Sequence, residues 1–136
     1  MHGNAQCERD QEMKKKLFSI FTDNMNRCLV TGIEATEENR NGIEIHHIFS
    51  GTDRPRSELF GFCVPLHCSV HPNGARLDMK TNWTDLDHWL KRKCQEYFIE
   101  VAQIGDRDDW YRNFGRFYDD RADENLWLNG RFEWRL

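Results

Sequence analysis

The sequence predicts a small single domain of the α+β class. Its 136 residues are enough for one hydrophobic core and too few for two. Short apolar segments bounded by turn formers indicate brief strands in the first half of the chain. One long segment with apolar residues at helical spacing, residues 84–102, predicts the main helix. We therefore expect one domain over residues 1–136, with its strands preceding its main helix.

The first predicted elements are a helix and a strand. Residues 12–25 place apolar side chains between charged ones, which predicts a short amphipathic helix near the N-terminus. Residues 28–32, which begin at Cys28 and end at Gly32, are typical of a strand that enters a turn. After a polar surface segment, the apolar residues 43–49 predict a further strand.

A short helix and another strand follow in the sequence. Residues 53–61 carry the signals of a helix that begins and soon ends, with Asp53 as cap, an early Pro55 and a closing Gly61. Residues 62–66 form a brief apolar segment, in which a proline predicts an edge strand. Residues 67–83 are rich in turn formers and predict irregular structure.

The second half of the chain is predicted to be helical. Thr84 and Asp87 resemble a capping box that begins the main helix, with Asp in place of the usual Glu. The apolar face of this helix is expected to comprise Leu86, Trp89, Leu90, Cys94, Tyr97, Phe98 and Val101. Gly105 predicts its end. Residues 110–118 favour a further short helix that packs back on the core, within an acidic and aromatic extension.

Two adjacent histidines, His46 and His47, interrupt the apolar strand of residues 43–49. A buried strand should alternate or be continuously apolar, and two polar rings within it cost free energy unless each is satisfied. Imidazole binds divalent metal ions and exchanges protons near neutral pH without unusual tuning. The pair therefore predicts a metal, a substrate or a hydrogen-bonding partner at this strand.

Composition narrows the environment in which we expect the protein to work. The sequence lacks the apolar stretch of a secretory signal and any run long enough to cross a membrane. Its five cysteines, an odd number, favour reduced thiols over a disulfide framework. We expect a soluble protein of the cytoplasm with no membrane partner. The net charge of −4 disfavours a broad nucleic-acid-coating surface but permits a local phosphate-binding groove.

The order of the motifs along the chain is more informative than any single motif. The motifs are residues 28–32, 46–54, 57–61 and 64–66, then His71, Leu86, Asp87, Leu90, Lys91, Gln95, Phe98 and residues 114–118. Together they resemble the HNH, or ββα-metal, endonuclease superfamily, and most closely its phage-type HNH-like proteins linked to recombination. The resemblance implies a ββα-metal, treble-clef-like core over about residues 28–80. The N-terminal helix and the helix at about residues 84–102 would flank it, within a C-terminal extension of residues 84–136.

The resemblance also implies a role for each histidine of the site. Carried onto this sequence, His46 is a metal ligand, His47 is the general base and His71, 24 residues after His47, is the distal metal ligand. The expected ion is Mg²⁺ or Mn²⁺, with Zn²⁺ as the alternative. Phosphodiester hydrolysis needs an activated water and a cation near the phosphate, which agrees with these roles. Neighbouring residues of a regular strand face opposite sides, so both rings can share a site only where the strand ends, twists or bulges.

Two parts of the family pattern are replaced in this sequence. The position of the middle Asn of the HNH triad falls near Phe62, and Thr31 stands where a second Cys of the first zinc knuckle would be. A structural zinc, which many relatives hold, needs four N or S ligands. Its candidate ligands here are Cys28, Cys63, Cys68 and either His67 or His71. Should His71 bind that zinc, Asn73 and Asp78 are the reserve ligands of the catalytic metal.

The basic residues after the histidine pair complete the predicted site. Arg54 and Arg56 are candidate phosphate clamps, with exposed helix-start charges as the alternative interpretation. The resemblance implies a metal-dependent HNH-like endonuclease that hydrolyses DNA phosphodiester bonds in phage recombination or replication, in the host cytoplasm if phage-encoded. Its partners would be DNA and a phage or host recombination protein. The alternatives are a catalytically inactive DNA- or protein-binding module on the same fold, and a structural domain whose histidines are merely hydrogen-bonded.

Overall fold

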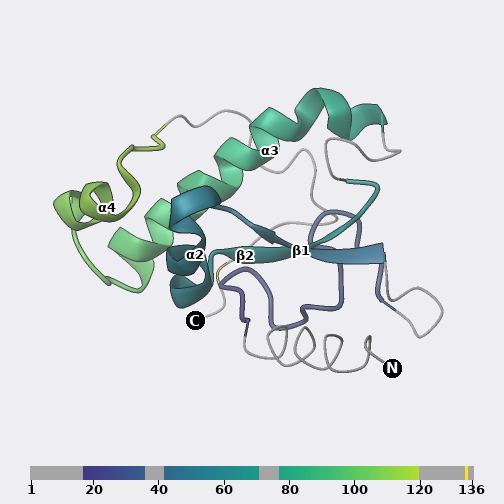
Figure 1. The fold of residues 1–136 in the computed structure, drawn as a ribbon, viewed down its shortest axis with the longest axis horizontal. Helices are drawn as coiled ribbons and strands as arrows, with labels where there is room; N and C mark the ends of the chain where they lie inside the picture. The colour runs from purple at the N-terminus through teal and green to yellow at the C-terminus, as the bar shows by residue number, and fades with distance from the viewer. Residues whose placement is uncertain (1–16, 36–41, 71–76, 120–133, 135–136) are drawn as a thin grey trace.

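In the part of the chain that the structure describes, a two-stranded antiparallel sheet and three α-helices make up the fold, in agreement with the predicted α+β class. The computed structural model describes residues 17–35, 42–70, 77–119 and 134. Its elements, in chain order, are β1 (Ile43–His47), the 3₁₀ turn η2 (Gly51–Asp53), α2 (Arg54–Phe60), β2 (Cys63–His67), α3 (Leu77–Glu96), the π-helical turn η3 (Tyr97–Val101) and α4 (Arg107–Phe114). The long helix α3 runs across the sheet, whereas α2 lies at one end of it (Figure 1).

The register of the sheet fixes the positions of both histidines. His46 lies opposite Val64, and His47 lies opposite Cys63. The ladder continues past the end of β1, because the Ile48 N–H donates to the Phe62 carbonyl at 3.0 Å. The strand is therefore paired through both histidines.

The outer edge of β2 contacts the turn that begins at Cys28. Pro65, which has no N–H, directs its carbonyl away from β1 and accepts the Leu29 N–H at 2.9 Å. The predicted turn over residues 28–32 is confirmed, with Gly32 at φ 78°. The strand expected to enter it is reduced to one isolated bridge, between Arg27 and Glu34.

Helix α2 follows its predicted signals at both ends. A proline lies in its first turn, and it ends at Gly61 in the left-handed conformation at φ 76°. A Cβ at Gly61 would approach the Phe18 ring to 2.4 Å, so both the backbone and the packing require glycine. Asp53 occupies the N-cap position, but its carboxylate accepts from the Arg56 side chain at 2.8 Å and makes no capping bond.

The predicted start of the main helix was wrong. Helix α3 begins at Leu77, so Thr84 and Asp87 lie within it, and the Asp87 carboxylate pairs with Lys91 at 2.8 Å. A Thr and an Asp three residues apart can lie inside a helix as well as at its start, so this pair alone does not locate the first residue of the helix. The predicted end is close to the observed one, because η3 closes the helix with an Ala102 N–H to Tyr97 carbonyl bond at 2.8 Å.

The helix predicted over residues 12–25 is absent from residues 17–25, the part that the structure describes. Side-chain oxygens there accept backbone N–H groups two residues ahead: Ser19 accepts from Phe21 at 3.0 Å, and Thr22 accepts from Asn24 at 3.1 Å. Such local bonds compete with helix formation. The segment is then held to the end of α2 by the Ile20 N–H, which donates to the Gly61 carbonyl at 3.0 Å.

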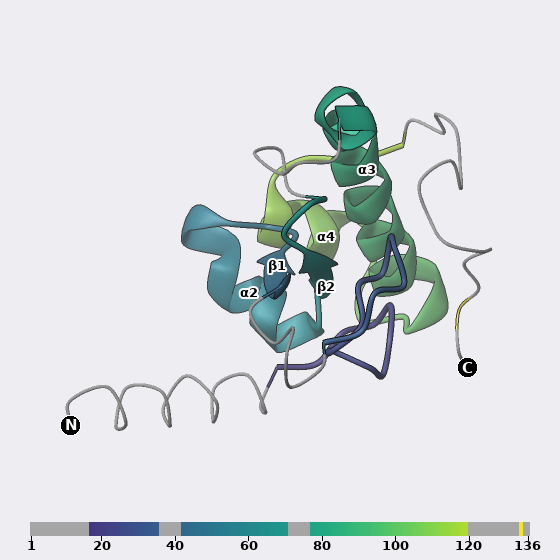
Figure 2. The ribbon, with the colours of Figure 1, turned by 90° about the vertical axis from the view of Figure 1, so that its right-hand side faces the viewer.

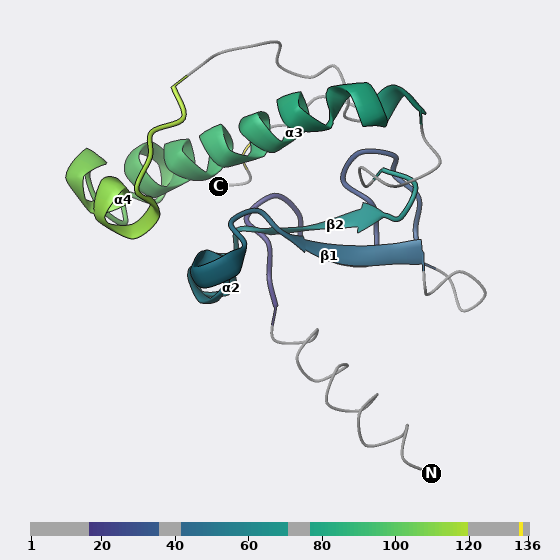
Figure 3. The same ribbon diagram turned by 45° about the horizontal axis from the view of Figure 1, so that its top comes forward.

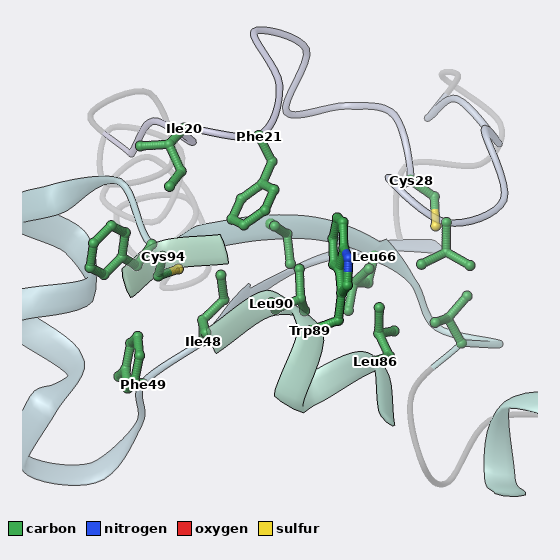
Figure 4. Packing of buried hydrophobic residues seen from close by; sticks show 14 of the residues in the cluster. Ile20, Phe21, Cys28, Ile48, Phe49, Leu66, Leu86, Trp89, Leu90 and Cys94 are labelled. Atoms are coloured by element: carbon green, nitrogen blue, oxygen red, sulfur yellow. The ribbon is translucent and has the colours of Figure 1, made fainter. Parts of the chain in front are cut away.

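The hydrophobic core lies between the sheet and α3. Figure 4 shows Leu86, Trp89 and Leu90 of α3 directed toward the strands, with Ile20 and Phe21 joining from the segment before Cys28. A second group of packed rings joins the end of β1 to the C-terminal half. Its members are Phe49, Phe60, Phe62, Phe98, Trp110 and Phe114. Helix α4 is thereby part of the same core, as predicted for residues 110–118.

None of the helices in the described ranges has the length and apolar character that a membrane span needs.

Candidate active site

His47 forms a close contact with a carboxylate at the end of β1. Its Nε2 lies 2.9 Å from Oε1 of Glu58, eleven residues later in α2. The His47 side chain is 10% exposed and the Glu58 side chain 35%, so the contact is shielded at the imidazole and open at the carboxylate. A His–carboxylate contact of this length restricts the rotation of the ring and leaves Nδ1 available for chemistry.

Ser57 holds α2 in the position that this contact requires. Its buried hydroxyl donates to the Phe49 carbonyl at 2.7 Å and accepts the Phe49 N–H at 3.0 Å. The backbone just after β1 is therefore bonded to the residue that precedes Glu58. The distance between His47 and Glu58 follows from this link as well as from their own bond.

The two predicted phosphate clamps have different surroundings. Arg54 lies one turn before Glu58 on the same face of α2, with Nε 3.9 Å from Glu58 Oε1, and its side chain is 61% exposed. Arg56 donates to Asp53 at 2.8 Å. Of the two, Arg54 is the cation placed beside the His47 site.

His46 contacts a different helix from His47. Its ring packs edge-on against Trp83 of α3, with centroids 5.2 Å apart and planes at 74°. Helices α2 and α3 lie on different sides of the two strands (Figure 2). The alternation expected of a regular strand is thus present, and β1 ends at His47.

The remaining predicted ligands of the catalytic metal are only partly within the structure. His71 and Asn73 lie outside the described residues, and of Asp78 only the backbone is described, in the first turn of α3. Within the described ranges, no three His, Cys, Asp or Glu side chains gather in a way that could hold a metal ion. His46 supplies an imidazole, a donor that suits Zn²⁺ better than Mg²⁺ or Mn²⁺, so a complete site for the expected ions depends on His71 and on oxygen ligands.

The candidate zinc ligands lie in separate surroundings. Cys28 is buried, and its Sγ accepts the Thr31 N–H at 3.3 Å, whereas Cys68 is exposed. The Nδ1 of His67 pairs with the hydroxyl of Ser69 at 2.8 Å.

Cys63 differs from the other candidate zinc ligands because burial makes its thiol a weaker acid. Burial, and secondarily the negative charge of Glu58, raises the pKa of the Cys63 thiol to about 12. Its Sγ lies 3.8 Å from the Ser57 carbonyl. At neutral pH Cys63 therefore packs as a protonated, apolar side chain.

A hollow of about 480 Å³ lies elsewhere, between the second half of α3 and the segment after α4. Its charged residues pair with one another, Arg107 with Asp119 at 3.1 Å and Lys93 with Glu96 at 3.0 Å. Among the described residues, none of the predicted site residues lines it. The predicted site residues that the structure describes therefore lie outside this hollow.

The sequence did not reveal Glu58 and Ser57 as members of the site. Both fall inside the motif of residues 57–61 but had no assigned role. Their contacts reach back across a turn to His47 and Phe49. The one local signal is the spacing of Arg54 and Glu58, which places both on one helical face.

Comparison of this chain with family models, curated proteins and solved structures gave no match. The chemistry is accordingly argued from the residues at the end of β1.

Proposed function

We propose that this protein is a metal-dependent HNH-like endonuclease that hydrolyses DNA phosphodiester bonds, with His47 as the general base. The observation that supports this most is the 2.9 Å contact between His47 and Glu58 beside the exposed Arg54. An imidazole oriented by a carboxylate is a common arrangement for a catalytic base. We further propose that β1, β2 and α3 form the ββα-metal core. A role in phage recombination or replication rests on the family resemblance.

The proposed reaction is a hydrolytic displacement at phosphorus. His47 takes a proton from a water molecule, and the water oxygen forms a bond to phosphorus. The bond between phosphorus and the leaving sugar oxygen breaks, and that oxygen takes a proton from solvent. Arg54 pairs with a non-bridging phosphate oxygen. General-base catalysis of this kind contributes about 10²–10⁴-fold.

His46 and His71 are the residues that would hold the divalent ion. When bound, Mg²⁺ or Mn²⁺ would stabilise negative charge on the phosphate and on the leaving oxygen. His46, the described ligand, directly precedes the proposed base in β1, and its ring contacts Trp83 of α3.

The test is cleavage of supercoiled plasmid by purified protein with Mg²⁺ or Mn²⁺. His47→Ala should lower the nicking rate by about 10²-fold or more, while DNA affinity, measured by fluorescence anisotropy, and the circular dichroism spectrum stay unchanged. His88→Ala is the matched control, because this imidazole lies on α3 near Tyr118. Undiminished nicking by His47→Ala would show that His47 is not the base. EDTA should abolish nicking, and added Mn²⁺ should restore it.

The second candidate function is a DNA- or protein-binding module without catalysis. It is favoured by Phe62, a fully buried ring near the position where the family pattern has an Asn. Metal analysis of the purified protein separates the two proposals. Tightly bound zinc without nicking supports the module, whereas nicking that is lost on chelation supports the enzyme.

A further inference from the structure

We infer that Glu58 is a positioning residue that fixes the tautomer of His47, so that Nδ1 is the atom that takes the proton from water. The inference rests on the proposed role of His47 as general base. A neutral imidazole has one N–H donor and one acceptor nitrogen, and an ionised carboxylate only accepts. With Oε1 of Glu58 2.9 Å from Nε2, the hydrogen belongs on Nε2 and the free lone pair on Nδ1.

The burial of the ring supports this assignment. The His47 side chain is 10% exposed, so little of the ring meets solvent. The ring cannot exchange its two nitrogens by a simple rotation without breaking the bond to Glu58. The Glu58 carboxylate therefore sets both the tautomer and the orientation of the His47 imidazole.

Two neighbouring residues, Ser57 and Arg54, hold the Glu58 carboxylate in place. Ser57, its neighbour, is bonded twice to the backbone of Phe49. Arg54 lies 3.9 Å from the same carboxylate oxygen, and its positive charge offsets the repulsion that Glu58 would exert on an approaching phosphate. Arg54 is thus placed to contact both the positioning residue and the substrate.

Replacements of Glu58 separate this role from packing. Glu58→Met keeps the length of the side chain but removes the acceptor. Glu58→Gln keeps one acceptor oxygen, so it should retain the bond and most of the activity. Glu44→Met is the matched control, because Glu44 is an exposed glutamate of β1.

The first measurement is an NMR spectrum of protein labelled with ¹⁵N-histidine, without DNA or metal. The wild-type protein should show a protected Nε2–H proton for His47, identified by its loss in His47→Ala. The signal should persist in Glu58→Gln and Glu44→Met and disappear in Glu58→Met. Its absence from the wild type, or its persistence in Glu58→Met, overturns the inference.

The second measurement is plasmid nicking. Glu58→Met should lower kcat by about 10–100-fold with little change in KM, as expected when the partner that orients a histidine is lost. Full activity in Glu58→Met overturns the positioning role even where the NMR signal behaves as expected. If the wild type shows the signal but cuts no DNA, the tautomer assignment stands and the endonuclease proposal falls. Failure of the tautomer assignment can therefore be distinguished from failure of the endonuclease proposal.

Discussion

Ser57 is the residue through which the proposed site is joined to the core. It is fully buried, and its hydroxyl both donates to and accepts from the backbone of Phe49. A backbone group left buried without a partner costs about 1–3 kcal/mol. The same side chain thus stabilises the fold and sets the distance between His47 and Glu58.

Ser57→Ala should lower the free energy of unfolding by about 2–4 kcal/mol, because two buried backbone groups lose their partner. Urea denaturation followed by circular dichroism measures this change. Ser50→Ala is the control, since Ser50 is exposed and its side chain makes no capping bond to η2. A loss in Ser57→Ala no larger than that in Ser50→Ala would contradict the role of Ser57.

Part of the candidate site could be predicted at the residue scale. The sequence indicated that His46 and His47 each need a partner, and that a regular strand would direct them to opposite sides. The contact of His47 with Glu58 agrees with the first expectation, and the placement of the two rings against different helices agrees with the second. The identity of these partners could not be predicted, because it depends on how α2 and α3 return to β1. The metal-ligand and base roles stay predictions.

At the scale of elements, the helix-start signals show why a local motif has to be judged with its surroundings. An Asp three residues before another Asp begins α4, where Asp106 and Asp109 form a capping box with bonds of 2.8 and 3.0 Å. A similar pair, Thr84 and Asp87, lies inside α3. Gly105, which lies outside any helix, precedes Asp106, so the pair there begins a helix. The residues before Thr84 are already helical, so the pair there lies in the helix interior.

The capping box should make the stability of the protein depend on pH. The Asp106 backbone N–H, and then the Arg112 guanidinium, hold the pKa of Asp109 below its usual value. A carboxyl with a lowered folded pKa contributes stability above its unfolded pKa of about 3.9 and loses it as pH falls through the folded pKa. Asp109→Ala should therefore lower Tm at pH 7, and the difference from the wild type should narrow below about pH 4.

Differential scanning calorimetry between pH 7 and about pH 2.5 checks this expectation. Asp108→Ala, in the same first turn, removes an equal charge that is not part of the box, so its effect at pH 7 should be smaller. A constant difference in Tm between Asp109→Ala and the wild type at all pH values would contradict the proposed cause.

Helix and strand positions were otherwise predictable where apolar periodicity and turn residues agree. Both strands, α2 and α4 lie within a few residues of their predicted places. The N-terminal helix was predicted from its apolar spacing alone. Ser19 and Thr22 override that spacing over residues 17–25, because their side chains bind the backbone that a helix would use.

At the scale of the whole molecule, the second group of packed rings holds α4 against the rest of the core. Trp110 is fully buried, with ring centroids 4.3 Å from Phe114, 5.5 Å from Phe98 and 5.6 Å from Phe49. Its Nε1 donates to the Arg116 carbonyl at 2.8 Å. Trp110 therefore packs α4 against Phe49, just after β1, and against Phe98 of η3. Figure 3 shows α4 beyond the C-terminal end of α3.

Trp110→Ala should lower the free energy of unfolding by about 3–5 kcal/mol, a large fraction of the total for a domain of this size. Trp110→Phe keeps much of the packing and loses the bond to Arg116, so we expect a smaller loss of about 1–2 kcal/mol. Equilibrium denaturation in urea compares both variants with the wild type. Equal losses in the two variants would show that the hydrogen bond, and not the packing, supplies the stability.

The outer edge of β2 has a consequence for association between chains. A partner that adds a strand to a sheet needs free N–H and C=O groups along its edge. At the middle of β2 the proline nitrogen of Pro65 offers no donor, and its carbonyl is taken by Leu29. Growth of the sheet on this side, by a peptide or by a second copy, is thus opposed by a nitrogen that carries no hydrogen and an oxygen that is already in use.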